Sequence, residues 1–248
     1  MKLFSLVLLM IVQSMMAQNF VLEKSKAKNY SIELQYQFYS PKTVSEPAPL
    51  VVFLHGAGER GCDNVAQSIH GVNGFLKQYE RRKFFLLAPQ CPLQHRWVET
   101  DWTLEKHQMN ESPSESSQMV FDIIDSLLKN NDKIDVERIY VCGLSMGGFG
   151  TWEFLCRKPG FFAAAIPICG GADVSQAILL KNTPVWAFHG MNDKVVLPKR
   201  TIDMVNAIKQ NGGNPIITLY ENAGHDSWTK TFANDLIYDW LFAQKRNK

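Results

Sequence analysis

Few features of this sequence indicate a nucleic acid, a metal ion or a cofactor as a partner. Lysine and arginine total 26 residues and aspartate and glutamate total 24, so the formal net charge is only +2. Proteins that bind nucleic acid usually carry a basic patch, and the basic clusters here are the short runs Arg81-Arg82-Lys83 and Lys245-Arg246. There is no C-x-x-C pair and no histidine cluster, so we expect neither a metal site nor a cofactor.

Cysteine is scarce, and its odd number leaves at least one thiol without an intramolecular partner. The five are Cys62, Cys91, Cys142, Cys156 and Cys169. Cys142 and Cys156 fall in apolar segments and are expected to be small core residues. Cys62 and Cys91 fall in loops at the same end of the predicted sheet, where a disulfide between them is possible.

The sequence has no apolar run long enough to span a bilayer comfortably. Met1 to Ala17 instead resembles a secretory signal, with Lys2 before an apolar stretch and a small residue at the expected cleavage point. No cysteine follows that point, so we expect no lipid anchor and no stable membrane attachment. Export to the periplasm or the medium is the predicted outcome, and a buried N-terminal helix is the alternative.

Short apolar runs alternate with amphipathic segments from Tyr30 onward. Strands are expected at Ile32–Tyr39, Leu50–Leu54, Phe84–Ala88, Ile139–Cys142, Ala163–Ile168, Val185–His189 and Ile216–Tyr220. Helices are expected at Ser116–Lys129, Phe149–Lys158, Pro198–Gln210 and Thr229–Phe242. This alternation predicts an α/β fold with a mostly parallel central sheet and helices on both faces. No repeat or low-complexity linker divides residues 18–248, so we expect one domain there.

The most informative motif is Gly143-Leu144-Ser145-Met146-Gly147, which lies between an apolar run and a predicted helix. In that strand–turn–helix context, G-x-S-x-G is typical of a nucleophile elbow. The elbow strains the backbone of its central residue, and small neighbours such as Gly143 and Gly147 avoid a clash. Ser145 is therefore the candidate nucleophile. The alternative is a glycine-containing turn that holds a serine by chance.

A serine nucleophile needs a base to take its proton and an acid to orient that base. With this type of elbow, the acid and then the histidine follow the nucleophile in the chain. His225 follows the last predicted strand and is the candidate base, while Asp193 follows the strand before it and is the candidate acid. Asp173 is the alternative acid. His189 lies inside a predicted strand and is expected to be structural.

Two backbone amides are candidates for an oxyanion hole. One is the N–H of Met146, the residue after the proposed nucleophile. The other is the N–H of Ala57 in the glycine-rich loop His55–Gly61, whose glycines allow the backbone to approach a substrate closely. The alternative is that this loop is a plain glycine-rich turn.

A long polar loop, Gln90–Pro113, is rich in tryptophan and histidine, and loops of this length are usually functional. Gln90, Trp97 and Trp102 in this loop, and Trp228 after the candidate base, are predicted to bind substrate. Aromatic faces there could stack on a sugar or phenolic ring. The alternative is that they pack beneath the loop. No large insertion could form a lid, so a small or partly soluble ester is favoured over a lipid aggregate.

Several motifs together resemble those of the α/β-hydrolase superfamily, within exported esterases akin to dienelactone hydrolase and the feruloyl and acetyl-xylan esterases. Related chains are also described as predicted peptidases or phospholipase/carboxylesterases. The matching segments are His55–Gly61, Ala88–Pro92 with Arg96-Trp97, Gly143–Gly148, His189-Gly190 with Asp193, and Gly224-His225. Cys62 departs from the pattern, because relatives often carry an acidic residue there.

This resemblance implies a serine carboxylesterase that hydrolyses short-chain or aromatic acyl esters through an acyl-enzyme. Its substrate would be a small-molecule or polysaccharide-linked ester, such as an acetyl or feruloyl group on a polysaccharide. A serine peptidase of the same fold is the first alternative. A hydrolase scaffold that binds a partner without catalysis is the second.

Overall fold

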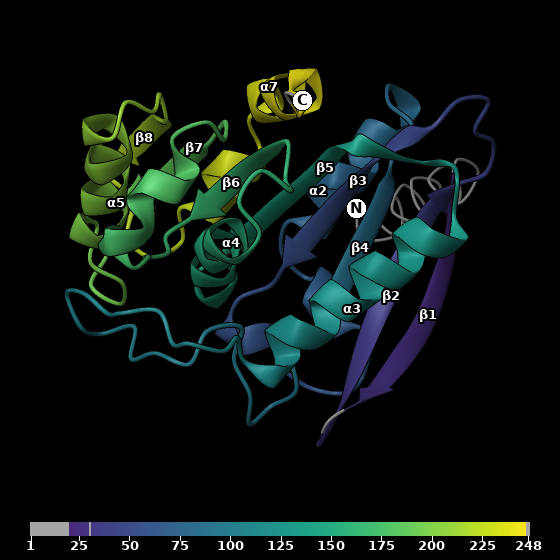
Figure 1. Ribbon diagram of the computed structural model, residues 1–248, viewed down its shortest axis with the longest axis horizontal. Helices are drawn as coiled ribbons and strands as arrows, with labels where there is room; N and C mark the ends of the chain where they lie inside the picture. The colour runs from purple at the N-terminus through teal and green to yellow at the C-terminus, as the bar shows by residue number, and fades with distance from the viewer. Residues whose placement is uncertain (1–19, 30, 247–248) are drawn as a thin grey trace, which may run out of the picture.

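An eight-stranded sheet forms the centre of the computed structural model, which describes residues 20–29 and 31–246 (Figure 1). The order of its strands is β1-β2-β4-β3-β5-β6-β7-β8. β2 pairs antiparallel with both β1 and β4, and the other neighbours pair in parallel. The predicted fold class is therefore confirmed. The predicted signal segment, Met1–Ala17, lies outside the described residues.

The strands are β1 (Phe20–Asn29), β2 (Ile32–Pro41), β3 (Ala48–Leu54), β4 (Phe85–Gln90), β5 (Ile134–Leu144), β6 (Ala164–Ile168), β7 (Trp186–Gly190) and β8 (Ile216–Tyr220). The α-helices are α2 (Val72–Leu76), α3 (Glu115–Asn130), α4 (Met146–Arg157), α5 (Lys199–Gln210), α6 (Trp228–Phe232) and α7 (Asp235–Ala243). The 3-10 helices are η1 (Ala57–Glu59), η2 (Ala66–Ser68), η3 (Lys77–Glu80) and η4 (Val174–Leu180).

β1 is an element that the sequence pattern does not predict. It forms the edge of the sheet, and its residues from Val21 to Lys26 are exposed. A strand that buries so little apolar surface has no alternating apolar pattern in its sequence. Its extended conformation is instead fixed by backbone pairing with β2.

Two apolar layers lie on opposite faces of the sheet, and successive residues of β3 enter them in turn. Leu50, Val52 and Leu54 belong to the layer that α3, α4 and α5 cover, whereas Val51 and Phe53 belong to the layer that α2 and α7 cover. Every residue of β3 is buried, which explains its continuous apolar sequence. Figure 1 shows α3 and α4 over one face of the sheet.

The cysteines answer a question that the sequence left open. All five are free thiols, so the possible disulfide between Cys62 and Cys91 is not formed. Cys91 is completely buried, and its sulfur lies 3.5 Å from Ser116 Oγ, whereas Cys62 is exposed. Cys142 and Cys156 are buried core residues, as predicted. Among the described residues, no helix has the length and apolar character that crossing a membrane requires.

Gly147 lies where the first turn of α4 meets the end of β3. A Cβ at this position would overlap the carbonyl oxygen of Leu54, a backbone atom that cannot move without disturbing the central strand. The absence of a side chain is thus a packing requirement at this point, and it brings the turn at Ser145 next to the end of β3.

We expect Gly147→Ala to lower the free energy of unfolding by about 3 kcal/mol, because it overpacks a rigid backbone contact. Gly58→Ala is the matched control, since a Cβ on Gly58 meets no atom within 4 Å. The control should stay within about 0.5 kcal/mol of the wild type. Urea unfolding measures both variants, and similar midpoints would contradict the packing argument.

Candidate active site

Ser145 occupies the sharp turn between β5 and α4. Its backbone has φ 53° and ψ −117°, a region that residues with a side chain rarely adopt. The amide of Ser145 donates to the Ile168 carbonyl at 2.9 Å, and its own carbonyl accepts from Phe149 at 3.1 Å. Strain of this kind persists only where the surroundings hold it, and it is common at functional sites. The predicted strand–turn–helix context is present.

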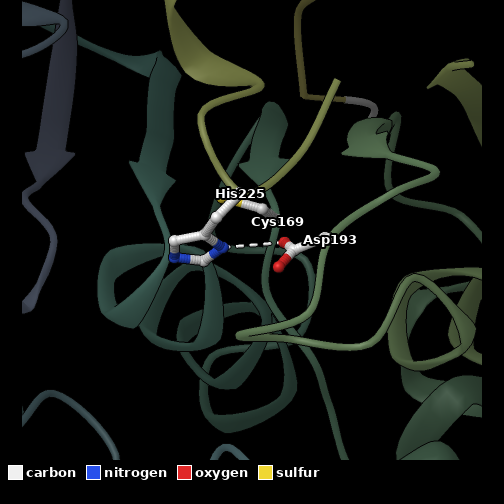
Figure 2. Close-up of side chains that lie close together, drawn as sticks. All are labelled: Cys169, Asp193 and His225. Carbon is white, nitrogen blue, oxygen red and sulfur yellow. Dashed lines mark hydrogen bonds and ion pairs between the residues drawn. The ribbon is translucent and has the colours of Figure 1, made fainter. Parts of the chain in front are cut away.

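The three predicted triad residues come together at the carboxyl end of the sheet. His225 Nε2 lies 2.9 Å from Ser145 Oγ, and His225 Nδ1 lies 2.7 Å from Asp193 Oδ2. Figure 2 shows the imidazole and the carboxylate, which come from the loops after β8 and β7. The side chain of Asp193 is fully buried, while that of His225 is 20% exposed. The histidine therefore links an open serine to a buried carboxylate.

Asp193 is held as a carboxylate by a dense set of donors. Its Oδ1 accepts from the amides of Val195 at 2.9 Å and Val196 at 3.0 Å. Burial by itself would raise the pKa of Asp193, but hydrogen bonds from His189, His225 and these amides outweigh it and hold the pKa well below its usual range. The alternative acid, Asp173, instead caps η4 through the Ser175 amide.

His189 contacts the candidate acid, Asp193, which the sequence did not predict. It was expected only to be a structural residue. It is completely buried, and its Nε2 lies 3.2 Å from Asp193 Oδ2 and 2.9 Å from the Val196 carbonyl. Since both neighbours are acceptors, Nε2 carries a proton and donates. Nδ1 lies 2.7 Å from Thr201 Oγ1. A histidine at the end of a strand, four residues before the candidate acid, was the signal available in the sequence.

Cys169 completes a group whose possible ligand atoms lie within 4.8 Å of one another, together with Asp193 and His225 (Figure 2). Such a set of atoms could in principle hold a metal ion. A metal would have to replace the hydrogen bond between Asp193 and His225, and it would need a thiolate. Burial strongly raises the pKa of the Cys169 thiol, which disfavours that form. The chemistry of this group therefore fits a hydrogen-bonded acid–base pair better than a metal centre.

His55 determines how the glycine-rich loop after β3 is oriented. Its Nε2 accepts from the Cys91 amide at 2.9 Å, so Nδ1 carries the proton and donates to the Gly56 carbonyl at 2.6 Å. The Gly56 carbonyl and the Ala57 N–H belong to one planar peptide unit. The bond from His55 thus also fixes the direction of the Ala57 N–H. Arg60 Nε binds the Ala57 carbonyl at 2.9 Å and holds the next peptide.

The segments that contain the two predicted oxyanion donors adjoin Ser145. A Cβ on Gly56 would lie 3.6 Å from the Cβ of Ser145, which places the Ala57 loop directly beside the serine. Met146 is the first residue of α4, so its N–H is among those without an acceptor inside the helix. The amino end of a helix also carries a partial positive charge.

The predicted substrate-binding residues divide into two groups. Trp97 and Gln90 are completely buried, so the prediction that they contact substrate is wrong. Trp97 Nε1 donates to the His55 carbonyl at 3.0 Å, and Gln90 Oε1 accepts from the Asn64 backbone N–H at 2.8 Å, so both support loops.

The other two predicted residues are only half-buried. Trp102 lies beneath the guanidinium of Arg96, at 4.4 Å. Trp228 is half-buried, and its ring lies 5.4 Å from that of His225.

A serine on a strained strand-to-helix turn, joined to a histidine and an aspartate from later loops of a mostly parallel sheet, defines the α/β-hydrolase class of proteins. The chain belongs to the phospholipase/carboxylesterase family, whose model matches residues 40–238. This finding confirms the resemblance inferred from the motifs.

Individual relatives agree with this assignment. A crystal structure of a thermostable esterase superposes with a TM-score of 0.82 at 37% identity, covering 94% of this chain and 64% of that one. Poly(3-hydroxyalkanoate) depolymerase C of Paucimonas lemoignei is 30% identical over 138 residues, or 56% of this chain and 31% of its own. Acyl-protein thioesterase 1 of Neurospora crassa is 26% identical over 226 residues, covering 80% and 87%. This chain thus covers 64% of the length of the thermostable esterase and 31% of that of the depolymerase.

The buried His55 makes stability depend on pH. Burial lowers the pKa of His55 from 6.5 to about 4, so between these values the unfolded chain takes up a proton that the folded protein does not. The contribution of His55 to the free energy of unfolding is therefore fully present well above pH 6.5. It is lost as the pH falls from 6.5 toward 4. We expect His55 to account for a loss of about 2 kcal/mol between pH 7 and pH 5.

Urea unfolding of the wild type and of His55→Gln at these two pH values measures that contribution. The variant should lose about 2 kcal/mol less stability than the wild type on acidification. Tyr140→Phe is the control, because it removes a hydrogen bond to the Gln244 carbonyl and leaves the surroundings of His55 intact. It should be less stable at both pH values with an unchanged difference between them. Equal losses in wild type and His55→Gln would contradict the assignment.

Proposed function

We propose that this protein is a serine carboxylesterase, with Ser145 as nucleophile, His225 as general base and acid, and Asp193 as the group that orients His225. One observation carries this proposal. His225 bridges Ser145 Oγ at 2.9 Å and Asp193 Oδ2 at 2.7 Å through its two different ring nitrogens. Because Nδ1 donates to the carboxylate, Nε2 has a free lone pair directed at the serine hydroxyl.

The geometry supports a two-step reaction. His225 Nε2 takes the hydroxyl proton as Ser145 Oγ attacks the ester carbonyl, and the negative oxygen that forms is bound by the N–H groups of Ala57 and Met146. The intermediate collapses, the C–O bond to the alcohol breaks, and His225 returns the proton to the leaving oxygen. Water then attacks the acyl-enzyme by the same route and releases the acid and the free serine.

The environment of Asp193 favours this chemistry. Its low pKa keeps it ionised at neutral pH, and an ionised carboxylate stabilises the imidazolium that exists in each step. His189 donates to the same oxygen from the protein interior, so the carboxylate is held in place when His225 moves its proton. This arrangement adds positioning without supplying a second base.

Short-chain or aromatic acyl esters are the proposed substrates, and acetyl or feruloyl groups on polysaccharides are the specific candidates. The names of the relatives support ester chemistry, since they include an esterase and a thioesterase. The polysaccharide part of the proposal also depends on export through the Met1–Ala17 segment, which we propose from the sequence alone.

Ser145→Ala should lower the turnover of p-nitrophenyl acetate by at least about 10⁴-fold, because no other group can form the acyl-enzyme. Ser112→Ala, at an exposed position, is the control and should retain wild-type turnover. A fluorophosphonate probe should label the wild type and the control but not Ser145→Ala. Equal hydrolysis by wild type and Ser145→Ala would exclude the mechanism, and cleavage of peptides without cleavage of esters would favour a peptidase.

The position of the Ala57 N–H can be tested through His55, because two replacements retain different halves of its contacts. Asparagine can still donate to the Gly56 carbonyl from the position of Nδ1, whereas glutamine reaches only the position of Nε2. His55→Asn should therefore retain most of the kcat for p-nitrophenyl acetate, and His55→Gln should lose about tenfold or more. Circular dichroism checks that both variants fold. The reverse order of the two kcat values would disprove this role of His55.

A further inference from the structure

Glu59 is a buried carboxylate beside the candidate nucleophile that the proposed mechanism does not use. It ends η1, the 3-10 helix that begins with Ala57, and it is only 8% exposed. A Cβ on Gly56 would lie 3.0 Å from Glu59 Oε2 and 3.6 Å from Ser145 Cβ, so the carboxylate and the serine flank the same glycine. Within the described part of the chain, Oε2 has no hydrogen-bond partner.

The charge of this carboxylate is poorly balanced by its surroundings. Arg60 is adjacent in sequence, but its guanidinium is engaged with the carbonyls of Ala57 and His95. A basic side chain close to Glu59 is that of His70, whose Nε2 lies 3.8 Å from Glu59 Oε1 and which is 40% exposed. At 3.8 Å and with a partly exposed ring, His70 gives this carboxylate only weak compensation. Glu59 thus differs from Asp193, whose oxygens are saturated with donors.

An aromatic ring lies on the other side of His70. The Trp228 ring is 5.7 Å from the His70 ring and 5.4 Å from the ring of His225, so it contacts both His70 and the candidate base. Trp228 Nε1 is a second buried polar atom without a partner among the described residues. A carboxylate together with an aromatic face attracts cations and hydrogen-bond donors, and it repels anions.

We propose that Glu59 is a specificity-determining residue, whose carboxylate selects esters that carry a positive charge near the reacting bond and rejects those that carry a carboxylate there. This inference rests on the proposed function, because it concerns the substrates of the same serine. For polysaccharides it means that esters of neutral or amino sugars are preferred to esters of uronic acids.

Three aryl acetates test the proposal, because they share the acyl group and differ in the charge of the alcohol. They are the acetates of 4-hydroxybenzoate, which is anionic, of 4-hydroxybenzamide, which is neutral, and of (4-hydroxyphenyl)trimethylammonium, which is cationic. The measured quantity is the ratio of kcat/KM for the cationic ester to that for the anionic ester. Comparing this ratio between variants cancels the intrinsic reactivity of each ester.

Glu59→Gln preserves the shape of the side chain and removes its charge. We expect it to lower the cation-to-anion ratio by about tenfold, the size of effect that a unit charge has at short range in a partly buried site. The matched control is Glu105→Gln, which removes an exposed carboxylate from the 91–113 loop and should leave the ratio within about twofold of the wild type.

His70→Lys is a second variant that tests the same charge without altering Glu59. A lysine at this partly exposed position places a permanent cation near the carboxylate, so the ratio should fall in the same direction. If Ser145 is required for all three hydrolyses but neither Glu59→Gln nor His70→Lys changes the ratio, the charge selection is wrong and the esterase proposal stands. If Ser145→Ala hydrolyses the neutral ester as fast as the wild type, the proposed function itself fails.

Discussion

The close approach of α4 to the end of β3 is the contact on which the rest of the site depends. Gly147 brings the first turn of the helix against the backbone of Leu54, with no space for a side chain between them. This contact places the strained Ser145 and the amino end of α4 beside the loop that contains Ala57. Segments far apart in the sequence thereby meet at the hydroxyl group of Ser145, and they include the two amides that we propose as oxyanion donors.

The charges around this volume are treated in two different ways. Asp193 is buried and surrounded by donors, including the buried His189, so its negative charge is stabilised and directed toward His225. Glu59 is also buried, but one of its oxygens has no partner in the described residues. A protein gains stability by satisfying a buried carboxylate, so an unsatisfied one next to the proposed nucleophile is better explained by substrate selection than by folding.

Much of the fold could be predicted because buried strands carry a strong signal. The apolar run of β3 and the helical spacing of α3 were readable from side-chain type alone. β1 was missed because an exposed edge strand needs no apolar pattern. Trp97 and Gln90 were assigned to substrate because large polar or aromatic residues in a loop suggest binding. Gln90 instead ends β4, and Trp97 lies in the loop that follows. Their complete burial depends on contacts with the distant segments around Asn64 and His55, which the local sequence does not encode.

The sequence by itself determined the chemical groups of the site and the order in which they occur. The glycines around Ser145, and the positions of Asp193 and His225 after successive strands, follow from local backbone rules that act over a few residues. Only the tertiary structure decided the roles of His55, His189 and Glu59. Each role consists of contacts, or of missing contacts, between distant segments. Burial converts those contacts into fixed peptide orientations, a low pKa and an unbalanced charge.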